Sequence, residues 1–137
     1  MTQAYQSLRQ RALEQQRRLE GRPRVRVGTS MCGLAAGAAE VAEAFRQELA
    51  TRGVDAVVSE VGCMGMCYAE PLVDIQPMGG SRTFYSNVTP DLVPQLVQFQ
   101  LIESQPVFDG ALATLDGGAS PEVPALGDLD MMRGQVR

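Results

Sequence analysis

Residues 54–67 read Val-Asp-Ala-Val-Val-Ser-Glu-Val-Gly-Cys-Met-Gly-Met-Cys. The β-branched run in the first half predicts a strand, and this strand stops at Gly62. Directly afterwards Cys63 and Cys67 stand four positions apart, with Gly65 between them. This order predicts a strand that delivers two thiols into a tight loop, where the glycines leave the backbone accessible.

The third cysteine, Cys32, has a similar setting earlier in the chain. Residues 24–27 alternate between arginine and valine, which predicts a short strand, and a glycine-containing loop leads from there to Cys32. Apolar residues at helical spacing follow, until Gly53 predicts the end of a helix. A strand, helix, strand crossover favours parallel strands, whose carboxyl ends share one edge of the sheet. We therefore expect Cys32 to face the later cysteine pair across that edge.

Weaker signals mark the other elements. Residues 3–21 place a thin apolar stripe among Gln, Arg and Glu, which predicts an amphipathic helix that packs on the domain or on a partner. Residues 71–75 and 82–86 flank a glycine-containing turn and predict a β-hairpin. Thr89 and the proline after it predict the start of a last helix, and the Pro- and Gly-rich residues 103–137 predict an extended tail.

The order of these elements is strand, helix, strand, β-hairpin, helix. It is typical of a thioredoxin-like α/β domain, in which a four-stranded mixed sheet is flanked by helices. We therefore expect an N-terminal helix within residues 1–22, a thioredoxin-like domain over 23–102, and a linker or tail over 103–137.

Composition narrows the class of protein. A chain of 137 residues with 45% hydrophobic residues fits one globular domain. We expect a cytoplasmic protein without membrane insertion, because there is no run of about 18 apolar residues and no secretory h-region. The odd number of cysteines favours free thiols, metal ligation or redox work over a disulfide scaffold. Histidine is absent, which excludes His-dependent triads and Cys/His zinc sites within the chain.

Charge is distributed unevenly, although the net charge is only −4. The basic residues gather near the N-terminus, where seven of the twelve cationic side chains lie: Arg9, Arg11, Arg17, Arg18, Arg22, Arg24 and Arg26. Such arms can bind nucleic acid. These arginines, however, alternate with Gln and Glu and lack interleaved aromatic residues, so a solvated helix face is favoured and no nucleic-acid partner is expected.

The cysteines have three possible roles. A thioredoxin-type oxidoreductase needs a C-x-x-C motif at the start of its first helix, and this motif is missing. Iron–sulfur ligation accounts better for thiols in glycine-containing loops, because glycines let backbone N–H groups approach the sulfurs. The candidate cofactor-binding glycines are Gly28, Gly33, Gly62 and Gly65. The third interpretation is that the cysteines are small buried hydrophobic residues.

Three segments carry a specific family resemblance: Val-Gly-Thr-Ser-Met-Cys-Gly-Leu-Ala-Ala-Gly-Ala (27–38), Gly-Cys-Met-Gly-Met-Cys-Tyr-Ala-Glu-Pro-Leu-Val (62–73) and Phe-Tyr-Ser-Asn-Val-Thr-Pro (84–90). In order and spacing they resemble the N-terminal thioredoxin-like [2Fe-2S] ferredoxin domain of flavin-carrying NADH dehydrogenase subunits. Such subunits occur in relatives of complex I, bifurcating hydrogenases and NAD-linked formate dehydrogenases. The resemblance covers about residues 5–137, and it implies that the tail leads toward a flavin domain.

The resemblance also implies a ligand set. Cys32, Cys63 and Cys67 match the second, third and fourth ligands of a [2Fe-2S] cluster. Val27 stands where four-cysteine members have the first, at C-x4-C spacing. Three of the four expected thiolates are therefore present, and a side-chain oxygen of Thr29 or Ser30 could complete the set.

These observations leave two function classes and one minor alternative. The leading hypothesis is a one-electron transfer module of an NADH dehydrogenase-type flavoprotein, partnered by other subunits or domains of that complex. The FMN and NADH sites would lie beyond Arg137, so the module itself performs no bond chemistry. The second hypothesis is a cluster-free domain that docks the flavin subunit during assembly, and the minor one is thiol–disulfide exchange between Cys63 and Cys67. Whether the module forms a homodimer stays open.

Overall fold

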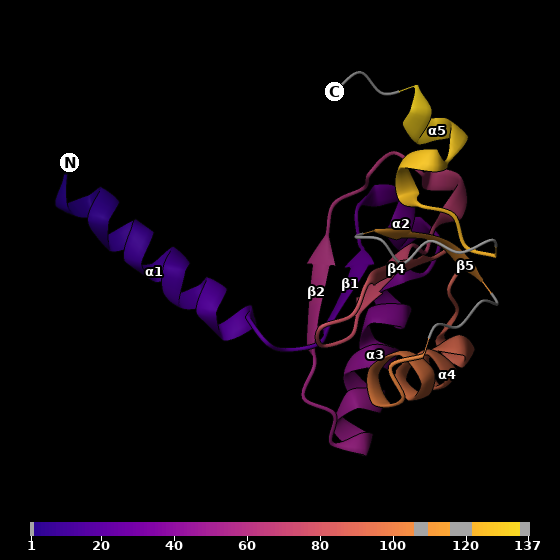
Figure 1. Ribbon diagram of the computed structural model, residues 1–137, viewed down its shortest axis with the longest axis horizontal. Coiled ribbons are helices and arrows are strands. Elements are labelled where there is room, and N and C mark those ends of the chain that lie inside the picture. The colour runs from indigo at the N-terminus through magenta and orange to yellow at the C-terminus, as the bar shows by residue number, and fades with distance from the viewer. Residues whose placement is uncertain (1, 106–109, 116–121, 135–137) are drawn as a thin grey trace.

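The computed structural model describes residues 2–105, 110–115 and 122–134, and its centre is a five-stranded mixed sheet flanked by helices (Figure 1). The strands are β1 (Arg24–Gly28), β2 (Val57–Val61), β3 (Val73–Gln76), β4 (Arg82–Tyr85) and β5 (Ala111–Leu115). The α-helices are α1 (Gln3–Leu19), α2 (Met31–Ala35), α3 (Ala38–Arg52), α4 (Val93–Leu96) and α5 (Asp130–Arg133). The predicted fold class, a mixed α/β sheet flanked by helices, is confirmed.

The strand order is β2-β1-β3-β4-β5. Strands β1 and β2 are parallel and joined through α3, as the crossover rule predicts. The β3–β4 pair is the predicted antiparallel hairpin, and β1 pairs antiparallel with β3. Because β1 and β2 run side by side in the same direction, the two loops that leave their carboxyl ends start next to each other.

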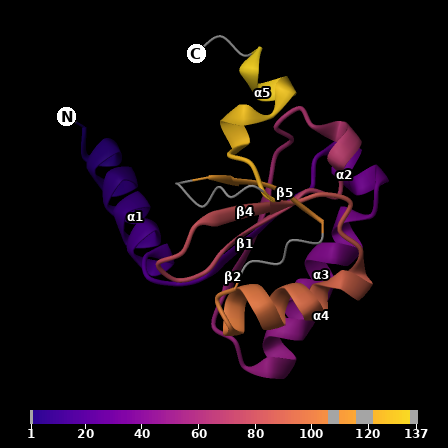
Figure 2. The same ribbon diagram turned by 45° about the vertical axis from the view of Figure 1, so that its right-hand side comes forward.

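The main core lies between the sheet and the helices α3 and α4 (Figure 2). The arginine–valine alternation of β1 turns Val25 and Val27 into this core, where both are completely buried. Helix α3 contributes Val41, Phe45 and Leu49, at the predicted spacing of four, and ends at Gly53 in a left-handed conformation. The opposite face of the sheet carries a smaller apolar cluster: Met66, Ala69, Leu72, Phe84, Ala113 and Leu126.

The last predicted helix is present, but it consists of three consecutive segments with different helical geometry. A 3-10 turn (Pro90–Leu92) leads into α4, and a π-helical segment (Val97–Ile102) continues it. Pro94 lies in the first turn of α4, where its missing N–H breaks no helical hydrogen bond. The predicted apolar face is confirmed, because Val93, Leu96, Val97 and Leu101 are all buried.

The expectation of four strands and an extended tail after residue 102 is corrected by β5. This fifth strand pairs antiparallel with β4 at the edge of the sheet. Its sequence, Ala-Leu-Ala-Thr-Leu, combines low intrinsic strand propensity at the alanines with flanking residues typical of loops. Pairing with β4 and burial of Ala113 stabilise the strand, and neither can be read from local sequence. After it come a 3-10 turn (Leu126–Asp128) and α5.

Helix α1 projects away from the sheet in both views (Figures 1 and 2), and none of its residues is buried. Among the described residues no helix is both long and apolar enough to span a bilayer.

Candidate metal centre

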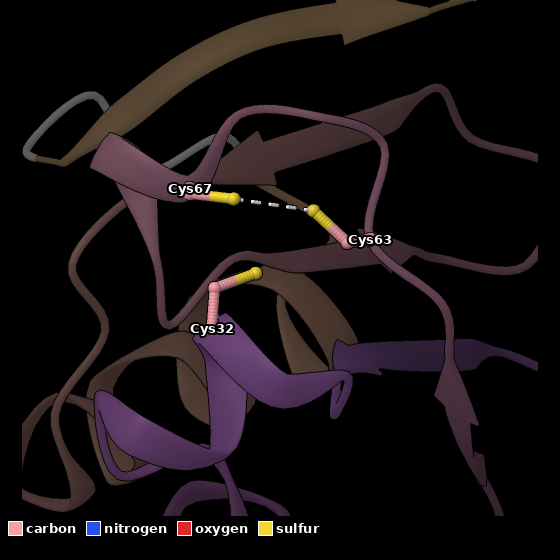
Figure 3. A group of neighbouring side chains, drawn as sticks. All are labelled: Cys32, Cys63 and Cys67. Atoms are coloured by element: carbon pink, nitrogen blue, oxygen red, sulfur yellow. Dashed lines mark hydrogen bonds between the residues drawn. The ribbon is translucent and has the colours of Figure 1, made fainter.

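The sulfur atoms of Cys32, Cys63 and Cys67 all lie within 4.8 Å of one another (Figure 3). Cys63 and Cys67 are exposed and Cys32 is half-buried. The expectation that Cys32 faces the later pair is therefore confirmed. Among the described residues this is the one group of three Cys, Asp, Glu or His side chains that converges closely enough to hold a metal ion.

The parallel pairing of β1 and β2 brings the three thiols together. Gly28 at the end of β1 is the register partner of Val61 at the end of β2. Beyond that pair the Thr29 N–H donates to the Val61 carbonyl oxygen at 3.0 Å, so the loop to Cys32 starts alongside the loop to Cys63. The second loop then ends in a 3-10 turn (Cys67–Ala69), which places Cys67 opposite Cys32.

Polar groups already surround the sulfurs. The backbone N–H of Gly65 donates to Cys63 Sγ at 3.1 Å, from a residue with φ of +92°, a conformation that favours glycine. Ser30 Oγ lies 3.5 Å from Cys32 Sγ, and Cys63 Sγ lies 3.6 Å from Cys67 Sγ. The site therefore offers donors that stabilise thiolate charge, as a metal centre requires.

These contacts separate the acidities of the thiols. A hydrogen bond from Ser30, supported by contacts with Cys67 and Cys63, lowers the pKa of Cys32 from 9.0 to about 7. The pKa of Cys67 is raised from 9.0 to about 12, because its protonated thiol is held by Cys32 and Cys63. Without metal, Cys32 thus loses its proton at lower pH than Cys67.

Alkylation of the metal-free protein tests this order. Because thiolates react with iodoacetamide and thiols do not, Cys32 is expected to react with a midpoint near pH 7 and Cys67 only in strongly alkaline solution. Replacing Ser30 with alanine should move the Cys32 midpoint to higher pH. The exposed Met31→Ala serves as the neighbouring control and should leave it unchanged. Peptide mapping by mass spectrometry reads each site. A wild-type Cys32 midpoint near 9 would contradict the assignment.

The four candidate glycines lie around these loops but in different surroundings. Gly28 and Gly33 are packed together, and a β-carbon on Gly33 would overlap with the Gly28 carbonyl oxygen and lie 2.9 Å from its carbonyl carbon. Gly62 borders open space, and Gly65 supplies the N–H described above. Gly33 is therefore needed for close packing of the backbone, whereas Gly62 is not.

Glu70 is a site residue that sequence reasoning missed. Its side chain is buried, and Oε2 accepts a 2.7 Å hydrogen bond from the Leu72 N–H. The carboxylate also packs against Gly28 and Gly33, so one side chain connects the loop after Cys67 with the turn around Cys32. The signal that could have found it is an isolated acid between Ala69 and a proline in an otherwise apolar segment.

Behind the cysteine loop, Glu70 lines a cavity of about 200 Å³ on the sheet face opposite α3. The other charged residues of this cavity are Arg26, Asp74 and Arg82. Asp74 accepts from Arg26 at 2.6 Å and from Arg82 at 2.8 and 2.9 Å, so its buried carboxylate is compensated.

Glu70→Ala is expected to lower the free energy of unfolding by about 2 kcal/mol. The change removes the acceptor of a buried N–H and opens space between two loops. Urea denaturation measures the effect. The exposed Glu14 on α1 is the matched control, and Glu14→Ala should shift stability by less than about 0.5 kcal/mol. Equal effects of the two substitutions would contradict the connecting role of Glu70.

Val27, where the family resemblance implies a first ligand, is a completely buried member of the main core. The candidate metal ligands are therefore the three thiols and the Ser30 hydroxyl. The Gly65 N–H adds a hydrogen bond to one of the sulfurs. Thiolates in glycine-containing loops suit iron–sulfur clusters, which usually take four protein ligands. The residues fit such a cluster with three sulfur ligands and one ligand of another kind.

No family model matches the chain. Among curated proteins, the NADP-reducing hydrogenase subunit HndB of Solidesulfovibrio fructosivorans is 30% identical over 100 residues, which cover 72% of this chain and 79% of that protein. A 2Fe-2S ferredoxin of Clostridium pasteurianum is 36% identical over 61 residues, 43% of this chain and 57% of the ferredoxin.

Solved structures of a thioredoxin-like [2Fe-2S] ferredoxin from Aquifex aeolicus share the fold. The wild-type structure at 1.5 Å has a TM-score of 0.58 and 24% identity, over 67% of this chain and 97% of the ferredoxin. A second structure has a TM-score of 0.60 and 22% identity, over 72% and 98% of the two chains. At this identity the likeness shows the fold alone.

Proposed function

The chain belongs to the family of the HndB subunit of NADP-reducing hydrogenase, and from this membership we propose that it is an electron-transfer module carrying a [2Fe-2S] cluster. The observation that carries the proposal is the convergence of three sulfurs within 4.8 Å at the end of the parallel strand pair. The names of the ferredoxin relatives support the cluster type. When bound, a [2Fe-2S] cluster accepts and releases single electrons.

The role of this chain is to hold and tune the cluster. Cys32, Cys63 and Cys67 would supply thiolates, and the lowered pKa of Cys32 makes its thiolate available near neutral pH. The Gly65 N–H would donate to the sulfur of Cys63, and such a hydrogen bond stabilises the more negative, reduced state. The Ser30 oxygen, 3.5 Å from Cys32 Sγ, is our candidate for the fourth ligand.

Anaerobic reconstitution tests the cluster directly. The full chain, incubated with Fe²⁺, sulfide and a thiol reductant and then desalted, is expected to retain about two iron and two sulfide per chain. Reduction with dithionite should produce the EPR signal of a one-electron reduced pair of irons. Three thiols can also hold Zn²⁺, so a parallel sample receives zinc. A chain that retains zinc but neither iron nor sulfide would overturn the electron-transfer proposal.

We further propose that the module exchanges electrons with a flavin-carrying subunit of an NADH dehydrogenase-type complex. Two points support this finer assignment: the resemblance of residues 27–38, 62–73 and 84–90 to such subunits, and a relative that is named as a hydrogenase subunit. Deleting the module from its complex should remove one [2Fe-2S] EPR signal and slow electron transfer from nicotinamide to the acceptor. A complex that keeps both would contradict the assignment.

The absence of a cysteine at position 27 favours a second candidate function, a cluster-free docking domain. In that case deletion should impair assembly of the complex, while the redox centres that still assemble keep their EPR signals. The two candidates therefore predict opposite results for the same deletion.

A further inference from the structure

Helix α1 has a surface pattern that the metal centre does not use. All of its residues lie outside the core, and Tyr5 and Leu8 keep 51% and 59% of their surface exposed. A single helix of 17 residues is only marginally stable in water. A helix that projects from the domain with exposed apolar side chains is stabilised when a partner covers them.

Four of the six apolar side chains of α1 follow a heptad pattern, whereas the exposed Leu13 lies at a b position outside it. Tyr5, Leu8, Ala12 and Leu19 occupy successive a, d, a and a positions, and the remaining d position is Gln15. This 3-4 spacing produces one narrow stripe along the helix, which is the geometry of a coiled-coil seam. The stripe therefore fits another helix better than it fits a flat surface or a deep pocket.

The residues beside the stripe restrict the choice of partner. Of the four e and g positions between residues 9 and 18, three are arginines, Arg9, Arg11 and Arg18, and the fourth is Gln16. Within the described part of the chain none of these arginines forms an ion pair. A second copy of α1 would offer no carboxylate at any of these positions, so self-pairing gathers like charges along one seam.

The acidic helix α3 of the same chain cannot serve as the partner. Its apolar residues Val41, Phe45 and Leu49 are already turned into the main core. Only its polar face, with Glu40 and Glu43, remains at the surface. This face has no apolar stripe to pair with α1.

We propose that α1 is a docking helix for an amphipathic helix of another protein, one with an apolar a/d seam flanked by Glu or Asp. The apolar stripe would provide the contact area, and the flanking arginines would select a partner by its charge. This inference goes beyond the proposed cluster and does not depend on it, because α1 contributes no ligand.

A binding measurement with a defined peptide tests the proposal. The probe is a fluorescein-labelled three-heptad peptide with Leu at a and d and Glu at e and g, titrated with the full chain and followed by anisotropy. One comparison peptide carries Lys at e and g, and a second has the composition of the probe in scrambled order. The acidic peptide is expected to bind, and the other two are not.

Two matched variants assign the contact. Reversing the charges of Arg9, Arg11 and Arg18 to Glu should weaken binding of the acidic peptide at least about tenfold and create binding of the Lys peptide. Arg17 occupies an f position, pointing away from the seam, and Arg17→Glu should change the affinity less than about twofold. Circular dichroism checks that each variant keeps its helix content.

Three results would overturn the proposal. Equal binding of the ordered and scrambled acidic peptides would reduce it to non-specific charge attraction. Equal effects of the Arg17→Glu and triple variants would show that the peptide does not bind along the a/d stripe. A dimer in sedimentation analysis that Leu8→Asp dissociates would identify the occupant as a second copy of the chain.

Discussion

Replacing Gly33 with alanine is expected to lower the free energy of unfolding by about 3 kcal/mol or more. The new β-carbon would overlap with the carbonyl oxygen of Gly28. That carbonyl cannot move away cheaply, because Gly28 ends β1, which is paired on both sides, and its N–H donates to the Leu72 carbonyl oxygen at 2.9 Å. The new β-carbon would also lie only 3.2 Å from Oε2 of the Glu70 carboxylate, so it has little room to shift.

Gly62→Ala is the matched control for this experiment. Both glycines lie in the loops that carry the cysteines, but a β-carbon at Gly62 meets nothing within 4 Å. Urea denaturation of the metal-free proteins should show a large loss for Gly33→Ala and a change below about 0.5 kcal/mol for Gly62→Ala. If Gly33→Ala is as stable as wild type, the contact between the α2 turn and β1 is looser than described.

The second large effect is expected for Cys67→Ala, which should reduce the iron retained after reconstitution by at least about tenfold. Only two thiolates would remain, and two protein ligands bind a cluster poorly. Cys67 is exposed, so its replacement should leave the unfolding curve of the metal-free protein nearly unchanged. An unchanged unfolding curve would show that the lost iron reflects a missing ligand and not an unfolded protein.

Met31→Ala is the control for the metal experiment. Met31 adjoins Cys32 but keeps 88% of its surface exposed, and its substitution should leave the iron content at the wild-type level. Iron and sulfide assays on the two variants, reconstituted side by side, give the comparison. If Cys67→Ala retained as much iron as Met31→Ala, the three cysteines would not form a common ligand set.

Several features could be predicted from the sequence because their signals are local. The arginine–valine alternation of β1 predicted its buried face, and the spacing of Val41, Phe45 and Leu49 predicted the side of α3 that enters the core. The strand, helix, strand crossover predicted parallel strands, and this placed Cys32 opposite Cys63 and Cys67 at one edge of the sheet. These inferences succeeded because side-chain period and crossover geometry are properties of the backbone that few tertiary contacts override.

Other features were decided by contacts between distant segments. Strand β5 depends on pairing with β4, which stabilises a sequence that has little strand propensity of its own. The role of Glu70 depends on two glycines about 40 residues earlier in the chain, which come within reach only when β1 and the loop after Cys67 meet. The burial of Val27 likewise follows from its register in β1, an interior strand of the sheet.

Residue type and strand periodicity are local properties, so the candidate metal ligands and the loops that carry them could be named from the sequence. The distances between the three sulfurs, the donors that face them and the buried carboxylate between their loops became evident only in the folded chain. Those distances depend on backbone pairing across the sheet, and the free energy of that pairing is shared among residues far apart in the chain.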